Sequence, residues 1–465
     1  MNPSGQTVNA YQIGVLAVAA VLVAILVAMH APGQISVDSG TALYEGLVGK
    51  AIGWGPTFFA AVLAWLGGGV VGASMFVALN TLVTYALFSA LLLVGVEANR
   101  RRWWRVLAAL LLAANPVFML YVGILWKDVL LATVAAAAAV LLLLLPRRTG
   151  AGLLLSGLLV MVCVAALPLI RQQGILLAIP LALAGAYSLA GRIPAAGWRR
   201  AAAMAGMLVL AGTTSQLLAL ASARQVEPLP ASPVSVGVST IQAYDVIGMV
   251  AYALPGDAAA WTKADAETIR RMQAGYSPER IDTLWHDPAV RRYTDSLRDG
   301  QLHRIWLAGI KHDPVAYLTH RRAAFAALLG FGGMAGCVPA YWGVAAAPEQ
   351  LEAVGLQEEM DPRDRQLGAL VLDLQSSLVF RHWWYAGILL VATIAVLRAR
   401  AGTQIHVLRA SVLGAWAYLL SFLPTTIACD FRYLYPVVML VTVVGIHLLL
   451  HPRPRSAADA GTDAE

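Results

Sequence analysis

The sequence predicts an all-α polytopic membrane protein with about ten transmembrane helices and one large extracytoplasmic, mainly helical domain. Apolar residues make up 59% of its 465 residues and charged residues only 13%, whereas soluble domains carry about 25% charged residues. The apolar residues form uninterrupted blocks, and a bilayer-spanning helix needs roughly 20 such residues. A block such as VLLATVAAAAAVLLLLLP does not alternate as barrel strands do, so helices are the only spanning structure that fits.

Residues 1–222 form the predicted N-terminal transmembrane module of about seven helices. Its first apolar run is interpreted as a retained span, because no Lys or Arg precedes it and MHAPGQ is a poor cleavage site. The first external loop covers residues 31–56. Residues 56–69 are aromatic-rich and end in three glycines, which favours a helix lying at the membrane interface before the second span.

Residues 223–376 are mixed in character and carry a long charged run, which predicts amphipathic helices of a separate domain. The short Arg-rich loops ANRRRWWR, PRR and GRIPAAGWRR lie on the opposite side and are typical of a cytoplasmic face, so this domain is expected outside. Within it, residues 320–336 are apolar for too short a run to cross, and we expect an interfacial helix.

Residues 377–452 form the C-terminal transmembrane module of about three helices, the first of them near residues 384–397. Residues 453–465 are polar and predicted to be a disordered cytoplasmic tail. Counting the crossings from the Arg-rich loops puts both termini in the cytoplasm.

Charge and cysteine content exclude some classes of protein. The formal net charge is +7, but the arginines orient the spans in short loops, so nucleic-acid binding is not expected. The three cysteines make no disulfide framework. Cys163 lies in a span, whereas Cys337 and Cys429 face outward; they either pair or fill apolar space, and we expect the second.

Two carboxylates lie in the first external loop. Asp38 is followed closely by a glycine and is placed to deprotonate an acceptor hydroxyl or to hold a divalent cation. The plainer alternatives are a solvated acid or a helix N-cap. Glu45 is a second candidate substrate-binding group, although in a helical TALYEGLVGK stretch it would face solvent or pair with Lys50.

Polar residues also lie at the outward ends of the fourth and fifth spans. Lys127 and Asp128 follow an interfacial tryptophan, either as a cation placed for a phosphate or as a lysine reaching the interface beside a helix-capping acid. Arg171 and Gln172 form a second such group with Gln173. Neighbouring amides suit hydrogen bonds to sugar hydroxyls.

The later segments supply two further groups of candidates. His320, Arg321 and Arg322 begin the expected interfacial helix, where adjacent arginines favour phosphate or anionic headgroups. The CDFRYLYP stretch provides the last group; its arginine can bind phosphate through a planar fork, or the stretch is an aromatic belt with one ion pair. Its candidates are Asp430, Arg432 and Tyr433.

The sequence contains no zinc pattern, P-loop, dinucleotide fingerprint or nucleophile elbow. It resembles bacterial GT-C glycosyltransferases, integral-membrane enzymes that use polyprenyl-phosphate sugars. The resemblance rests on SVDSG, NPVFMLYVGILWKD, DPVAYLTHRRAAFAALL and DFRYLYP, and it covers most of the chain in layout.

The resemblance implies a multi-pass protein of the bacterial inner membrane with the lipid bilayer and a polyprenyl-phosphate sugar donor as partners. The acceptor would be an envelope glycan, lipid or protein. It also implies Asp38 as the catalytic acid, and Arg432 with Arg321 or Arg322 as phosphate ligands. Many members carry a second acid beside the first, but Ser39 follows here, so a metal requirement stays open and no other cofactor is expected.

Two other classes of protein remain as alternatives. A polymerase or ligase of lipid-linked polysaccharide, or a flippase or transporter, would also place arginines outside; a transporter would typically show repeats and charges at midplane, and the spans show neither. A non-catalytic scaffold would scatter the polar residues. Convergence of Asp38, Arg171 and Arg432 on one cavity would favour the enzyme.

Overall fold

The computed structural model describes residues 10–53, 55–96, 103–192, 197–230, 233–254, 256–297, 300–399 and 403–451. Within these ranges the protein is helical throughout, with isolated β-bridges but no strand. Ten helical stretches in the same ranges are long and apolar enough to cross a membrane. The prediction of an all-α, multi-pass membrane protein is therefore confirmed. The predicted tail at 453–465 lies outside the described residues.

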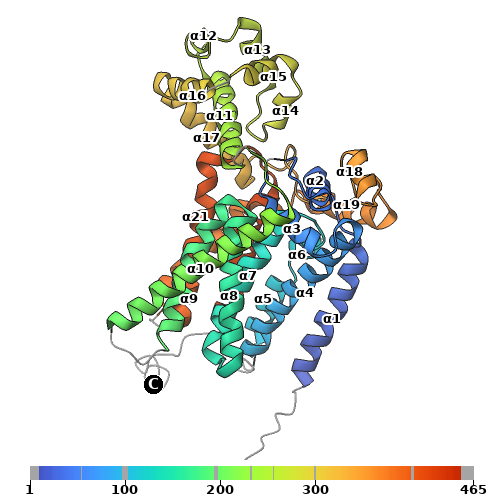
Figure 1. Ribbon diagram of the computed structural model, residues 1–465, viewed down its shortest axis with the longest axis vertical. Helices are drawn as coiled ribbons and strands as arrows, with labels where there is room; N and C mark the ends of the chain where they lie inside the picture. Colours follow the sequence, from blue (N-terminus) through green and yellow to red (C-terminus); the bar gives the residue numbers. More distant parts are fainter. Residues whose placement is uncertain are drawn as a thin grey trace, which may run out of the picture.

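The helical bundle is built around two strongly buried helices, α7 and α22, which pack against each other. The middle of α7 is a run of alanines that lets neighbouring helices approach closely. By contrast, α1 and α10 expose most of their apolar side chains and lie at the outside of the bundle (Figure 1). Its helices are α1 (Ala10–His30), α4 (Gly69–Val96), α5 (Trp103–Ala113), α6 (Pro116–Tyr121), α7 (Lys127–Leu144), α8 (Gly150–Ile170), α9 (Ile175–Ala190), α10 (Gly197–Gln225), α20 (His382–Leu397), α21 (Thr403–Thr425) and α22 (Tyr435–Leu450).

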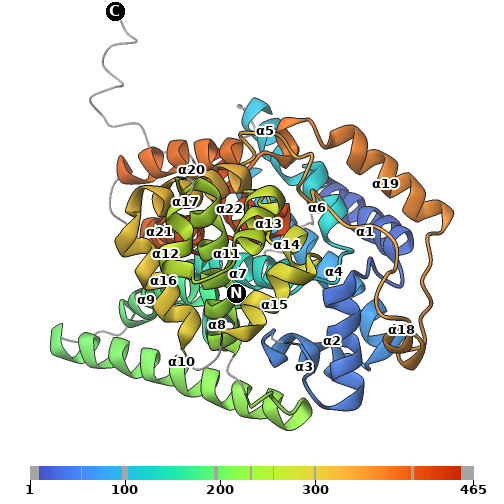
Figure 2. The same cartoon turned by 90° about the horizontal axis from the view of Figure 1, so that it is seen from above.

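A smaller helical domain projects from one end of the bundle (Figure 1). Seen from above, it lies over the side of the bundle that holds α7, α21 and α22 (Figure 2). Its core is a separate cluster of buried side chains around Tyr244, Met249 and Trp261. Its helices are α11 (Pro233–Tyr252), α12 (Asp257–Thr262), α13 (Ala266–Gly275), α14 (Asp282–Trp285), α15 (Pro288–Ser296), α16 (Gln301–His312) and α17 (Pro314–Leu329).

The ten candidate spans differ from the expected ten at one place. The expected eighth span is α20, which has only 16 residues but packs against α21 and α22 in the bundle. In its place, α11 is long and apolar enough to be one of the ten, although its sequence was not expected to form a span. Because α11 packs against α13, α16 and α17, it forms the centre of the projecting domain.

The region 223–376 contributes to two places in the fold. Its first part forms the projecting domain, whereas α18 (Pro348–Ala353) packs against α2 (Val37–Val48) and α19 (Pro362–Leu374) against α1. The expected interfacial helix at 320–336 differs as well: α17 ends at Leu329 and packs against α11, α16 and α21.

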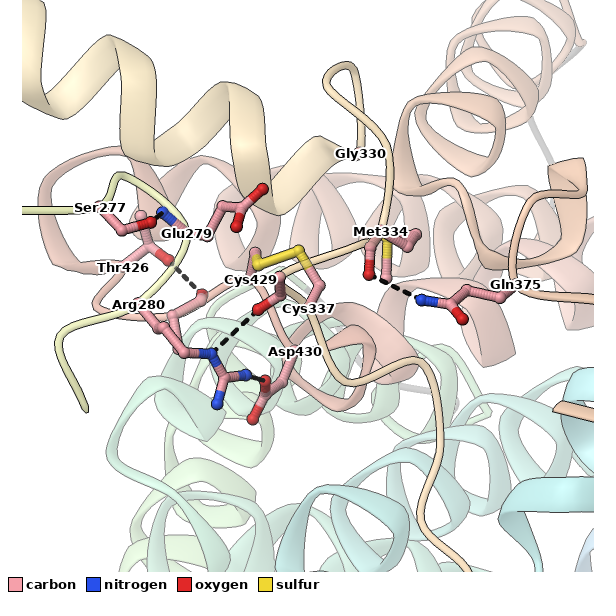
Figure 3. Close-up of a disulfide and its surroundings, with 12 residues drawn as sticks. Ser277, Glu279, Arg280, Gly330, Met334, Cys337, Gln375, Thr426, Cys429 and Asp430 are labelled. Carbon is pink, nitrogen blue, oxygen red and sulfur yellow. Dashed lines mark hydrogen bonds and ion pairs between the residues drawn. A yellow bond between two sulfur atoms is a disulfide. The ribbon is translucent and has the colours of Figure 1, made fainter. Parts of the chain in front are cut away.

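A disulfide bond joins the segment after α17 to the segment between α21 and α22. It links Cys337 to Cys429, so the expectation that both cysteines are apolar fillers is wrong (Figure 3). Arg280 of the projecting domain lies beside it and donates from Nε to the carbonyl oxygen of Gly336 over 3.0 Å. The amide of Cys429 donates to the carbonyl oxygen of Glu279 over 2.8 Å. The disulfide therefore marks the point where the projecting domain and the bundle are held together.

Candidate functional site

A cavity of about 480 Å³ lies where several helix ends meet between the bundle and the projecting domain. Its wall is formed by α2 (Val37–Val48), the start of α7, the turn between α8 and α9, the end of α21 and the first turns of α11. Eight of the twelve residues selected from the sequence line it: Asp38, Glu45, Lys127, Asp128, Arg171, Gln172, Arg432 and Tyr433.

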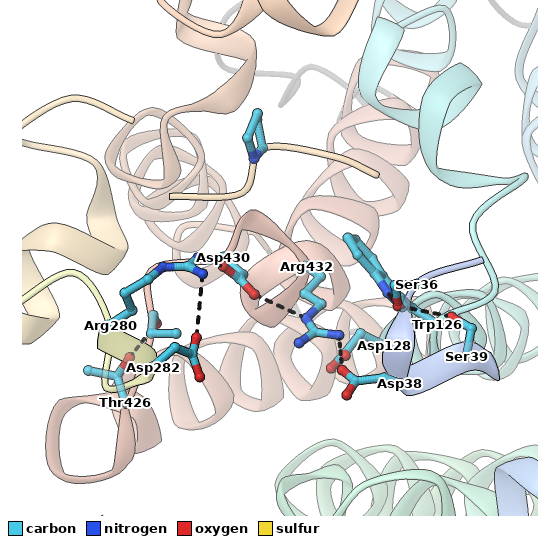
Figure 4. A network of polar contacts seen from close by, with 12 residues as sticks. Ser36, Asp38, Ser39, Trp126, Asp128, Arg280, Asp282, Thr426, Asp430 and Arg432 are labelled. Carbon is cyan, nitrogen blue, oxygen red and sulfur yellow. Dashed lines mark hydrogen bonds and ion pairs between the residues drawn. The ribbon is translucent and has the colours of Figure 1, made fainter. Parts of the chain in front are cut away.

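The helix that carries Asp38 is docked onto the segment before α7. Ser39 donates from Oγ to the carbonyl oxygen of Leu125 over 2.6 Å, and Trp126 donates from Nε1 to Oγ of Ser36 over 2.9 Å (Figure 4). Both serines are buried. These contacts fix the start of α2, so the Asp38 side chain projects into the cavity from a rigid element.

Arg432 is the centre of the polar network shown in Figure 4. Its Nη1 donates to Oδ2 of Asp38 over 2.5 Å, and its Nε lies 3.4 Å from Oδ2 of Asp430. Its guanidinium also lies over the rings of Trp126 and Tyr433, 4.9 and 5.4 Å from their centroids. The neighbouring Arg432 charge holds the pKa of Asp38 below its usual range.

A second arginine approaches the same tyrosine. Arg171 pairs with Asp128, whose side chain is almost completely buried. The Arg171 guanidinium lies over the rings of Tyr433 and Phe422, 4.8 and 5.3 Å from their centroids. Both guanidiniums therefore contact Tyr433 and share one cavity. Each guanidinium has five N–H donors, more than these carboxylate contacts use, so donors remain for a bound anion.

Glu45 lies two helical turns after Asp38 and is only 6% exposed. Its Oε1 accepts hydrogen bonds from the backbone N–H groups of Ile52 and Gly53 over 2.8 and 2.7 Å. The expectation that Glu45 faces solvent or pairs with Lys50 is therefore wrong, because the chain after α2 turns back and covers it. Burial raises the pKa of Glu45, with the two N–H groups acting in the opposite direction.

Asp430 lies behind Arg432, outside the cavity wall. Its two oxygens are shared between two arginines: Oδ1 accepts from Arg280 Nη2 over 2.6 Å and Oδ2 faces Arg432. Burial raises the pKa of Asp430, and the two arginine charges oppose that change.

The structure does not bring His320, Arg321 and Arg322 to the cavity. His320 and Arg321 are buried in the projecting domain, where they lie 3.2 and 2.5 Å from Oδ1 of Asp245, and Arg322 is exposed. The physical reason is that α17 passes through the domain instead of lying on a membrane surface. One link to the cavity remains, since Arg321 Nη1 donates to the carbonyl oxygen of Thr426 in the cavity wall over 2.8 Å.

Two residues that position the side chains of the site were not predicted from the sequence. The sequence indicates that Trp126 is an interfacial aromatic residue. In the structure the Arg432 guanidinium lies over its ring, and its Nε1 donates to Ser36 at the start of α2. Arg280 appears as one charge in a long mixed run, yet it binds Asp430. No local signal identifies Arg280, because its partner lies 150 residues further along the chain.

The divalent cation that the sequence left open at Asp38 has no evident set of ligands. In the part of the chain that the structure describes, no group of three or more His, Cys, Asp and Glu side chains is arranged to hold a metal ion. The charged side chains of the cavity are instead three acids and three bases, Asp38, Glu45, Asp128, Lys127, Arg171 and Arg432.

Comparison with known proteins gives no further guide: no family model matches the sequence, and searches of curated proteins and of solved structures found no match.

Proposed function

We propose that this protein is a membrane glycosyltransferase that moves a sugar from a polyprenyl-phosphate donor to an envelope glycan, lipid or protein acceptor on the extracytoplasmic face. The observation that carries the proposal is the convergence of Asp38, Arg171 and Arg432 on one cavity. These residues come from α2, the junction of α8 and α9, and the short 3-10 helix (Phe431–Leu434) that precedes α22. A scaffold has no need of such a convergence.

The donor phosphate binds between Arg171 and Arg432. A planar guanidinium matches phosphate oxygens through two parallel N–H donors, and both guanidiniums are fixed in place by stacking on aromatic rings. Lys127 adds a third cation to the same wall. Three carboxylates line the same cavity as these three cations, so donor binding exchanges one anion for another.

The lipid part of the donor has an apolar surface beside the phosphate position. The first turns of α11 contribute Val234, Val238 and Ile241 to the cavity, and α21 contributes Phe422. Val234 and Val238 are 56% and 46% exposed, although both are apolar. A cavity that is polar at one side and apolar at the other suits a phosphate attached to a hydrocarbon chain.

The acceptor binds on the side of α2. Its hydroxyl oxygen attacks the anomeric carbon while the bond from that carbon to the phosphate oxygen breaks. The polyprenyl phosphate leaves with the electron pair, and the two arginines stabilise its growing charge. Asp38 is the residue that the resemblance assigns to the acceptor proton. Gln172 and Gln173 line the same cavity, where their side-chain amides are partners for sugar hydroxyls.

A lipid-linked polysaccharide polymerase or ligase would use the same cavity and differs only in the length of donor and acceptor. A transporter is less well supported. Its binding site lies at midplane between repeats, whereas this cavity is formed at helix ends, by Lys127 at the start of α7 and Thr425 at the end of α21.

Mass spectrometry of envelope glycolipids and glycans tests the proposal. Cells that lack the protein should lose a product one sugar heavier than its precursor, and the wild-type gene should restore it. Arg432→Ala should not restore it. Arg270→Ala is the matched control, because Arg270 is 73% exposed on α13 and its ion pair is with Glu267 on the same helix. An unchanged glycan profile in the deletion strain would refute the transferase assignment.

A further inference from the structure

We infer that Glu45 is the residue that accepts the proton of the acceptor hydroxyl, and that Asp38 is a positioning residue for Arg432. This inference rests on the proposed glycosyl transfer, and it replaces the base that sequence position alone assigns. Both carboxylates belong to α2 and line the cavity. Seven residues separate them, about 10 Å along a helix, so they serve different parts of the same site.

The contacts of Asp38 make it a poor proton acceptor. Its Oδ2 already accepts a hydrogen bond from Arg432, and the charges of Lys127 and Arg171 also favour its ionised form. A carboxylate stabilised in this way binds a proton weakly, and a weak base contributes little to proton transfer. The same contact gives Asp38 another role, because it holds the Arg432 guanidinium on the cavity side of Trp126.

The contacts of Glu45 are those of an oriented base. Two backbone N–H groups hold Oε1, which fixes the direction of the carboxylate. No hydrogen bond from the described residues occupies Oε2. Burial also raises the pKa of this carboxyl, so its basicity lies closer to the neutral range than that of Asp38.

The charges around Glu45 do not remove the difference in basicity between Glu45 and Asp38. Lys127, at the start of α7, is the cation that acts on it. Of the helices packed against α2, α3 (Thr57–Trp65) carries no ionisable side chain, α4 carries Tyr85, and α18 carries Glu349 and Glu352. The neighbouring helices therefore add no second cation that would hold the carboxylate ionised.

The proton of the acceptor hydroxyl moves to Oε2 of Glu45. The electron pair of that O–H bond forms the new bond to the anomeric carbon, and the electron pair of the old carbon–oxygen bond leaves with the polyprenyl phosphate. Glu45 then releases the proton to water through the cavity.

Glu45→Gln is the discriminating variant, because its amide oxygen still accepts from Ile52 and Gly53 while the side chain no longer accepts a proton. Formation of the glycan product identified in wild-type cells should fall by about 10²–10⁴-fold, with an unchanged protein level and a thermal midpoint no lower than that of the wild type. Asp38→Asn should retain more activity than Glu45→Gln and lose affinity for the donor. If Glu45→Gln forms product at the wild-type rate, this inference fails while the transferase assignment stands.

Labelling with dicyclohexylcarbodiimide, which reacts with protonated carboxyls in apolar surroundings, gives a readout that does not depend on activity. In the full-length protein in nanodiscs, Glu45 should be modified with a pH midpoint above about 4.3, the ordinary value for glutamate. Asp38 should react only at lower pH. The assignment would be overturned if Asp38 were labelled at higher pH than Glu45, or if Glu45 stayed unmodified at every pH. If the deletion strain shows no missing glycan at all, the proposed function itself has failed, whatever the labelling shows.

Discussion

Arg432 donates a hydrogen bond to Asp38 across 394 residues of sequence, over 2.5 Å between Nη1 and Oδ2. This contact joins α2 to the short 3-10 helix (Phe431–Leu434) that precedes α22. Its guanidinium rests on Trp126, which in turn fixes the helix that carries Asp38. The two residues therefore belong to one rigid unit, and a substitution at either should change the position of the other side chain.

The first prediction concerns Arg432. Arg432→Lys should weaken binding of undecaprenyl phosphate by about 1.5–3 kcal/mol, the range for hydrogen bonds to charged groups. A lysine keeps the charge but loses the fork and the stacking on Trp126 and Tyr433. Binding can be measured with the protein in nanodiscs by intrinsic tryptophan fluorescence. Wild-type affinity in this variant, with Arg270→Lys as the exposed control, would count against a phosphate role.

The second prediction is a pH dependence of stability at Asp38. Its folded pKa is lower than its unfolded pKa, so its pairing with Arg432 stabilises the fold above the unfolded value of about 3.9 and is lost as the pH falls through the folded value. The wild-type protein should therefore melt higher than Asp38→Asn near neutral pH, with the difference shrinking in acid. Thermal midpoints across pH measure this. The pair is partly screened, since the Asp38 side chain is 65% exposed, so the shift should be modest.

The third prediction is that the pH dependence of stability at Glu45 has the opposite sign to that at Asp38. Its folded pKa is raised, so its burial costs stability as the pH rises from its unfolded value through its folded value. Glu45→Gln should therefore gain thermal stability relative to the wild type as the pH rises, because the amide stays neutral and keeps the contact with the two N–H groups. The same set of thermal midpoints checks this. A wild-type advantage that grows with pH would mean that the ionised carboxylate is well stabilised.

The sequence predicted the helical bundle because a long apolar block in lipid must satisfy its backbone hydrogen bonds within the segment, which favours a helix. It indicated most of the cavity residues for a related reason: polar residues next to helix ends, such as Arg171 and Arg432, meet at one end of the bundle. It did not predict which of these residues converge. His320 and Arg321 read as a membrane-facing pair, but Asp245 binds both within a buried cluster, and nothing near either residue in the sequence identifies that partner.

The disulfide could not be predicted for the same reason, because its two cysteines are distant in the sequence. Cys337 and Cys429 are 92 residues apart, and three cysteines alone do not say which of them pair. The burial of Glu45 could not be predicted, because the turn that covers it is held by backbone N–H groups, which every sequence provides. Helices and their polar ends could be predicted, whereas contacts made by backbone groups or across long separations could not.

The fourth prediction concerns the side of the membrane on which the projecting domain lies. Reporter fusions near Tyr276, between α13 and α14, should be active only in the extracytoplasmic sense, because the Arg-rich loops favour the other side for the opposite helix ends. The disulfide gives a second readout, since such bonds persist in oxidising compartments. Peptide mapping without reduction should recover Cys337 linked to Cys429. Cytoplasmic reporter activity would contradict the site's orientation.

The last prediction concerns Arg280, which connects the projecting domain to the cavity through Asp430. The two oxygens of Asp430 are divided between Arg280 at 2.6 Å and Arg432 at 3.4 Å. Removing Arg280 leaves a buried carboxylate with one cation, and Arg432 should then turn toward Asp430 and away from Asp38. Arg280→Ala should therefore weaken binding of undecaprenyl phosphate although Arg280 does not line the cavity.

A double-mutant cycle separates this effect from a general loss of structure. Arg280→Ala and Asp430→Asn should show a coupling of about 0.5–3 kcal/mol in donor binding, as expected for residues in one network. Arg280→Ala combined with Arg270→Ala should be additive, because Arg270 lies on the exposed face of α13. If donor binding were unchanged in Arg280→Ala while only the thermal midpoint fell, Arg280 would be a structural contact of the domain junction, and Arg432 would keep its position without it.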